Sequence, residues 1–189
     1  MGYKTNILMG GALLLFGAFV VLVEMRTKKN NSNSSNSNNT NNDSMNNNSN
    51  SSLPRGYRNN NPLNIRISNN NWVGKVYANT DGAFEQFTSM AYGYRAAMVT
   101  IRNYVNKYGL KTISQIIYRW APNNENNTSG YIQRVCSLTG MSANTVVDPD
   151  NKQTMTKLVY AMSIVENGNN PKPDEEAINS GWSLYTMSI

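Results

Sequence analysis

The chain has 189 residues, a formal net charge of +6, no histidine and one cysteine, Cys136. These counts exclude a Ser-His-Asp triad, a Cys-His pair, a zinc site with imidazole ligands and an intrachain disulfide. Catalysis by this chain would therefore depend on its 11 carboxylates, on tyrosine or lysine side chains, or on backbone dipoles.

The first 29 residues contain the apolar run ILMGGALLLFGAFVVLV at residues 7–23. A membrane-spanning helix needs about 20 such residues, so the run predicts a transmembrane anchor that contacts lipid. A cleaved signal peptide is the alternative, but no small-residue cleavage site precedes the charges that follow. We therefore expect a single-pass membrane protein, with a topology that the flanking charges are too few to fix.

Residues 30–52 consist mainly of Asn and Ser and contain no aromatic or branched aliphatic residue. Such a segment cannot bury enough apolar surface to offset the entropy of ordering, which predicts a disordered tether. By random-coil scaling its ends would lie roughly 25–30 Å apart. The tether would let a domain search the volume beside a membrane, and a plain spacer inside an assembly fits the composition equally well.

Residues 53–189 form one predicted domain, mainly α-helical with a small β-hairpin near its start. The segment WVGKVYANTDGAFEQFTS, residues 72–89, reads as two short strands around an Asn-Thr-Asp-Gly turn. Beyond it the apolar residues follow helical spacing, interrupted by residues that end helices. About five helices are expected, over residues 89–109, 112–121, 129–140, 148–168 and 173–188, the fourth started by Asp148 or Asp150.

Most carboxylates have ordinary roles at the membrane edge, in the tether or at helix starts: Glu24, Asp43, Asp148, Asp150, Asp174, Glu175 and Glu176. Asp81 suits the predicted hairpin turn. Glu85 alternates with aromatic residues on the second strand, where exposure to solvent is the first interpretation and lining a cleft is the second. Glu125, which precedes a predicted helix start, is a further candidate.

Glu166 differs from the other carboxylates, because it continues the apolar stripe of the helix predicted at 148–168. The other members of the stripe are Met155, Val159 and Met162. It also lies in the last turn, where the helix dipole disfavours negative charge, and both effects raise a carboxyl pKa. A carboxylic acid that stays protonated near neutral pH suits a general acid that protonates a glycosidic oxygen. The alternative is a glutamate that turns into solvent at a frayed helix end.

Several stretches of this domain resemble a known family. VYAMSIVENGNNP, which contains Glu166, resembles the glutamate-bearing helix of lysozyme-like lytic transglycosylases and glucosaminidases. NNNPLNIR, WVGK, FEQFTSMAYGYRAAM and WAPNNENNTSGYIQRV look like segments of phage and prophage virion proteins with a lysozyme-like domain. Together these stretches run through most of residues 54–182. In most lysozyme-like enzymes the glutamate helix precedes the β-region, so the resemblance implies a circularly permuted fold, with the NNNPLNIR loop beside the Glu166 helix and a cleft between them.

The resemblance implies an enzyme that cleaves peptidoglycan glycan strands between MurNAc and GlcNAc, with Glu166 as general acid. In a transglycosylase the same residue then acts as base toward the muramyl 6-hydroxyl. A hydrolase commonly needs a second carboxylate, for which Glu85 and Asp81 are the candidates. Tyr131 falls near a functional tyrosine of the glucosaminidases, with packing at a helix start as the alternative.

The candidate substrate contacts are Asn61, Asn64, Trp72 and Glu125. Amides offer both donors and acceptors to sugar hydroxyls, and an indole ring stacks on sugar faces. For Trp72 and Trp120, packing in the core is the first interpretation. No metal or cofactor is expected.

Four of the 17 basic residues and two of the 11 acidic residues precede residue 53, so the predicted domain has a net charge near +4. A wall polymer with free carboxylates would attract it. The preferred function is a muralytic enzyme in the internal membrane of a lipid-containing phage virion, or in a cell envelope, where other virion proteins are further partners. A structural virion membrane protein with an inactive lysozyme-like domain is the second. Nucleic acid is the least favoured partner, because the basic residues form no cluster of four.

Overall fold

The computed structural model describes residues 52–124 and 126–188. The anchor predicted at residues 7–23, nearly all of the predicted tether, and Glu125 lie outside the described residues. Within the described ranges, no helix combines the length and the apolar character that crossing a membrane requires.

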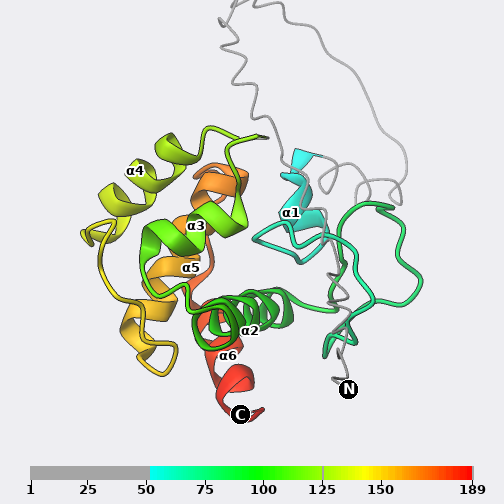
Figure 1. Ribbon diagram of the computed structural model, residues 1–189. Helices are drawn as coiled ribbons and strands as arrows, with labels where there is room; N and C mark the ends of the chain where they lie inside the picture. The colour runs from blue at the N-terminus through cyan, green and yellow to red at the C-terminus, as the bar shows by residue number, and fades with distance from the viewer. Residues whose placement is uncertain (1–51, 125, 189) are drawn as a thin grey trace, which may run out of the picture.

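Six helices pack around one core in the described part of the chain (Figure 1). They are α1 (Arg55–Arg58), α2 (Met90–Tyr108), α3 (Ile113–Trp120), α4 (Thr128–Thr139), α5 (Lys152–Asn167) and α6 (Glu175–Thr186). The mainly α-helical class and the five helices expected from periodicity are confirmed. The short helix α1 was not predicted.

The helix ends follow the local chemistry of the sequence. Gly109 and Gly140 end α2 and α4 in the left-handed conformation, with φ of 67° and 71°, which glycine adopts without a steric penalty. The N-terminus of α3 carries a capping box formed by Thr112 and Gln115. At α5 the prediction needs correction, because the N-cap is Asn151 rather than an aspartate.

The core lies between α2, α3, α4, α5 and α6. Its largest fully buried side chains include Tyr94, Met98 and Ile101 of α2, Ile116 and Ile117 of α3, Met155, Leu158 and Met162 of α5, and Tyr185 of α6. The apolar stripe predicted to precede Glu166 is therefore buried, as expected for an amphipathic helix. Helix α6 lies along α2 and closes the core on that side (Figure 1).

The prediction of a regular β-hairpin over residues 72–89 is wrong, because the described residues contain no strand. Isolated antiparallel bridges hold this region instead, one between Lys75 and Phe87 and one between Arg66 and Phe84. Gly74, with φ of 79°, and the turn near Asp81 interrupt the extended backbone that a longer ladder requires. The two arms still lie side by side, but over too few residues to make strands.

Candidate active site

Glu166 lies in the last turn of α5, and three side chains from three other parts of the fold donate hydrogen bonds to it. Asn64, in the loop after α1, donates through Nδ2 to Oε2 at 3.1 Å. Trp120, at the end of α3, donates through Nε1 to Oε1 at 3.2 Å. The Tyr131 hydroxyl of α4 donates to the same Oε1 at 2.9 Å. The carboxyl group is thus half-buried at the meeting point of a loop and three helices.

Burial raises the pKa of Glu166, and the hydrogen bonds from Asn64, Tyr131 and Trp120 oppose that rise because they stabilise the charged form. The net direction is upward. Burial, reinforced by the neighbouring Glu166, also raises the pKa of Tyr131 well above its ordinary value of 10.0. Tyr131 therefore stays neutral and remains a donor. Since Oε1 accepts two hydrogen bonds and Oε2 accepts one, Oε2 has the greater capacity to carry the proton of the neutral acid.

The junction between α3 and α4 brings Trp120 and Tyr131 to the same carboxylate oxygen. The Thr128 hydroxyl, in the first turn of α4, donates to the carbonyl oxygen of Ala121 just after α3. The Trp120 ring packs edge-on against Tyr104 of α2, with centroids 6.3 Å apart. These contacts fix the indole and the phenol relative to each other, which is the preorganisation that a catalytic constellation requires.

The loop of the NNNPLNIR segment lies beside the last turn of α5, as the resemblance implied, and the two are in direct contact there. Besides the Asn64 contact, Asn167 Nδ2 donates to the carbonyl oxygen of Pro62 at 2.7 Å. Two neighbouring residues of α5, Glu166 and Asn167, thus hold a loop that is more than 100 positions earlier in the chain.

Asn61 does not fit its predicted role as a sugar contact. It is fully buried, and its Nδ2 donates to the carbonyl oxygens of Ile65 and Glu85 at 2.8 and 2.9 Å. Its Oδ1 accepts from the Ile65 N–H at 2.9 Å. The amide is therefore fully used in holding the loop, and we correct its role to a structural one.

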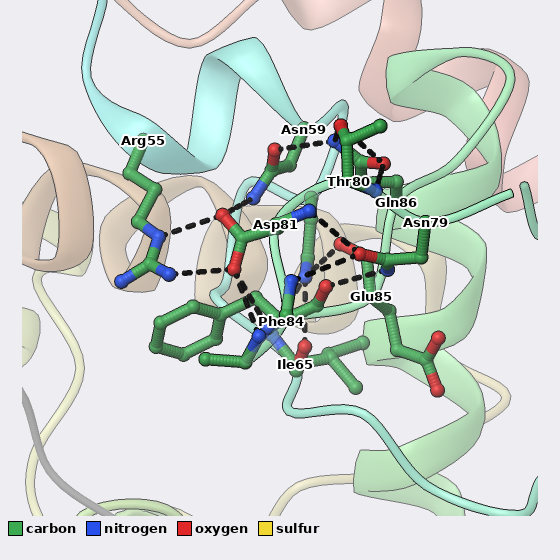
Figure 2. Close-up of polar contacts among 12 residues, drawn as sticks. Arg55, Asn59, Ile65, Asn79, Thr80, Asp81, Phe84, Glu85 and Gln86 are labelled. Carbon is green, nitrogen blue, oxygen red and sulfur yellow. Dashed lines mark hydrogen bonds and ion pairs between the residues drawn. The ribbon is translucent and has the colours of Figure 1, made fainter.

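Glu85 is fully buried, so the interpretation that it faces solvent is wrong. The alternation that suggested exposure belongs to a strand, and this segment is a loop. Its carboxylate forms an ion pair with Lys75 at 3.0 Å and accepts from the Ser68 N–H at 3.0 Å. Figure 2 shows the Glu85 carboxylate turned away from the Asp81 network. Its ion-pair and hydrogen-bond partners are thus residues of its own loop region, and Glu166 is not among them.

Asp81 serves the turn, as predicted, and it also binds α1 to this loop (Figure 2). Arg55 donates to both carboxylate oxygens, through Nε at 2.7 Å and through a terminal nitrogen at 2.6 Å, and Asn59 donates at 2.7 Å. Burial alone would raise the pKa of Asp81, but these bonds and the N–H groups of Phe84 and Ala83 hold it well below its usual range. Both candidates for a second catalytic carboxylate, Asp81 and Glu85, are therefore paired with a basic side chain.

The remaining candidates stay predictions. Trp72 is half-buried, and its indole nitrogen has no hydrogen-bond partner among the described residues. Glu125 lies outside the described residues. Over the described ranges, no group of three or more His, Cys, Asp or Glu side chains could hold a metal ion.

Trp120 is the site residue that sequence reasoning missed. Its helical position places it next to the buried Ile116 and Ile117, so periodicity predicted a core residue. Its ring does pack on the core, but its polar atom reaches Glu166. The sequence shows that Trp120 stands near a helix end, two residues before Pro122, but nothing in that position signals a contact with Glu166.

Comparisons with known proteins place the chain beside a bacteriophage protein. No family model matches it. It is 40% identical over 136 residues to "Protein P5" of Pseudoalteromonas phage PM2, a match that covers 69% of this chain and 82% of that protein. Such identity over most of both chains is enough to assign common descent and a common fold. The chain therefore belongs to the family of Protein P5 of phage PM2.

Proposed function

We propose that this protein is a peptidoglycan-cleaving enzyme of a phage virion, and that Glu166 is the general acid that cuts the MurNAc–GlcNAc bond. The observation that carries the proposal is the environment of Glu166: a half-buried carboxyl group with a raised pKa, held by three donors from separate elements. A carboxylic acid that is neutral when it meets a glycosidic oxygen is what this cleavage needs.

The first step breaks the bond between the muramyl C1 and the bridging oxygen. Glu166 gives its Oε2 proton to that oxygen, so the leaving sugar departs with a hydroxyl group. Positive charge develops at C1 and the ring oxygen, while the glutamate becomes a carboxylate. Asn64, Trp120 and Tyr131 then stabilise that carboxylate, because hydrogen bonds to a charged acceptor are stronger than those to a neutral one.

The second step returns the proton to Glu166. The muramyl 6-hydroxyl attacks C1 as the Glu166 carboxylate accepts its proton, which forms a 1,6-anhydro ring and consumes no water. Cleavage by a second carboxylate is less favoured, because Asp81 is bound to Arg55 and Glu85 to Lys75. In the described part of the chain, the groups that bond to Glu166 include no other carboxyl group. These pairings support a lytic transglycosylase over a hydrolase.

The fold and location belong to the same proposal. A circularly permuted lysozyme-like domain is supported by the contact between the Asn64 loop and the Glu166 helix, which such a permutation requires. The relationship to a phage protein supports a place in a virion. An anchor at residues 7–23 would hold the enzyme at the internal membrane of a lipid-containing virion, or at the host cell envelope, close to the wall.

A zymogram on purified peptidoglycan tests the proposal. The full chain should clear the gel, Glu166→Gln should not, and Glu176→Gln, the same change at an exposed position of α6, should clear it as the wild type does. Mass spectrometry of the products should show anhydro ends, whereas reducing ends would indicate a hydrolase. If folded wild-type protein clears no walls of several chemotypes, the structural virion protein with an inactive domain takes the place of this proposal.

A further inference from the structure

Asn64 is the partner of Glu166 that comes from a loop rather than from a helix, and its geometry points to a function of its own. We propose that Asn64 is a positioning residue: its amide fixes Oε2 of Glu166, and the bare α-carbon of Gly56 gives that amide its place. The proposal that Glu166 is a catalytic acid underlies only the kinetic part of this inference. The contact itself is a property of the folded chain.

The backbone at residue 64 is held in an unusual conformation. Asn64 has a φ of 49°, in the left-handed region, which asparagine tolerates better than most residues other than glycine. Its N–H donates to the Asn61 carbonyl oxygen at 2.9 Å, which closes a tight turn. The buried amide of Asn61 then anchors the turn to Ile65 and Glu85. The direction of the Asn64 side chain is therefore set by the backbone.

Gly56 of α1 leaves the space that this side chain occupies. A Cβ at residue 56 would lie 3.0 Å from Asn64 Oδ1 and 2.9 Å from the Asn61 carbonyl oxygen, and closer still to Asn167 Oδ1. Both side-chain oxygens are buried and have no hydrogen-bond partner among the described residues. They face the α-carbon of Gly56, whose C–H groups are weak donors. Any larger residue at 56 would displace the two amides that flank Glu166.

The same arrangement suits both protonation states of Glu166. In the structure Asn64 Nδ2 donates to Oε2, the arrangement that suits an ionised Glu166. With Glu166 protonated on Oε2, a rotation of the amide by 180° lets Oδ1 accept that proton. A neutral amide can do both, so it serves the acid step and the base step alike.

The groups that contact Glu166 make the effect measurable. Asn64 and Trp120 do not titrate, and burial keeps Tyr131 neutral by raising its pKa. A substitution at residue 64 should therefore appear directly as a shift in the pKa of Glu166.

The experiment compares Asn64→Gly with Asn60→Gly in the full chain. Both asparagines are left-handed, with φ of 49° and 50°, so glycine relieves the same strain at each. Asn60, however, donates to the Phe87 carbonyl oxygen and not to Glu166. The pKa of Glu166 is followed by 13C NMR of the glutamate carboxyl groups, with Glu166→Gln to assign the resonance, and the initial rate of wall clearing is measured across the pH range.

Asn64→Gly should raise the pKa of Glu166, move the alkaline limb of the activity profile to higher pH, and lower the maximal rate by roughly tenfold, the loss expected for a hydrogen bond to a charged group. Asn60→Gly should leave the pKa and the limb unchanged. Asn64→Asp should raise the pKa further, because two carboxyl groups would then share one site. Gly56→Ala should act in the same direction as Asn64→Gly.

Two results would overturn the inference. One is a folded Asn64→Gly variant with the wild-type pKa at Glu166, and the other is an equal shift in Asn60→Gly. If the NMR shifts appear as expected but the wild type clears no walls, the positioning role of Asn64 stands and the proposed enzymatic function fails.

Discussion

Burial of Glu166 raises its pKa, so over a range of pH the folded chain holds a proton that the unfolded chain releases. Stability then falls as pH rises, from the ordinary pKa of 4.5 up to the folded value, because the unfolded state binds fewer protons. Above the folded pKa the destabilisation is complete, and below 4.5 it is absent. Burial of the Glu166 carboxyl group is thus a source of instability at neutral pH.

Replacement of Glu166 by glutamine should therefore stabilise the protein at pH 7. The amide oxygen of glutamine can still accept from Trp120 and Tyr131, and the buried charge is gone. Thermal unfolding should show a higher Tm for the variant at pH 7, with a difference that disappears below pH 4.5. A lower Tm at pH 7 would contradict the assigned direction of the pKa shift.

Tyr131→Phe should slow wall cleavage by roughly tenfold, because the carboxylate formed in the first step loses a donor. It should also move the alkaline limb of activity to higher pH, since this hydrogen bond lowers the pKa of Glu166. Tyr118→Phe, which removes a hydroxyl from a half-exposed tyrosine of α3, is the matched control and should change neither property.

Residue by residue, the sequence was informative where chemistry is local. Glu166 could be singled out, because an apolar stripe and a helix end are visible in sequence spacing. The roles of Asn64 and Trp120 could not, because their bonds to Glu166 join positions 102 and 46 residues apart. No local sequence pattern shows that the indole N–H of Trp120 will donate to a carboxylate far along the chain.

At the scale of elements, α1 is held to the loop of residues 79–86 by one acidic side chain. Asp81 Oδ1 accepts from Arg55 and from the N–H groups of Phe84 and Ala83, while Oδ2 accepts from Arg55 and Asn59. The guanidinium also lies over the Phe84 ring, 4.5 Å from its centroid. Since α1 carries Gly56, this network supports the site without contacting it.

Asp81→Asn should destabilise the protein by about 2 kcal/mol at pH 7, because the Arg55 guanidinium would lose its charged partner. The pKa of Asp81 is lowered in the folded state, so its contribution is present above 3.8 and is lost as pH falls below that value. Urea denaturation should therefore show a difference between variant and wild type that shrinks on acidification. Asp150→Asn, at an exposed position, should change stability little at any pH.

Helices were predictable as elements because each has a period and a terminating residue, such as Gly109 or Gly140. The hairpin was not, because hydrogen bonds from side chains replace a ladder there: Asn79 Nδ2 donates to the Phe84 carbonyl oxygen, and Asp81 accepts from the turn. Alternation of residue type resembles a strand even when the backbone bends. Helix α1 has only four residues, too few to show a period.

At the scale of the whole molecule, the close approach of α6 to α2 depends on a single glycine. A Cβ at Gly181 would lie 2.8 Å from the Tyr94 Cβ and 2.9 Å from the Ala91 carbonyl oxygen. These two helices form the most extensive helix pair in the described chain. The core under α6 therefore has no room for one additional methyl group.

Gly181→Ala should lower the free energy of unfolding by about 1–3 kcal/mol, although alanine is the better helix former. Ser180→Ala, at the exposed neighbouring position, should be neutral or slightly stabilising. Thermal and urea unfolding of the two variants measure the difference. Equal free energies of unfolding for the two variants would contradict this prediction, because they would show that α2 and α6 can move apart without loss of stability.

The order of the site residues along the chain has a consequence for biosynthesis. Three donors, at positions 64, 120 and 131, leave the ribosome before the carboxyl group at position 166 that they bind. Chains are made from the N-terminus. A nascent chain that ends before α5 therefore contains the three donor residues but lacks the carboxyl group that they bind. Under the proposed function, cleavage chemistry therefore needs translation to pass residue 166, and a product terminated before that residue would be harmless to the wall of the cell that makes it.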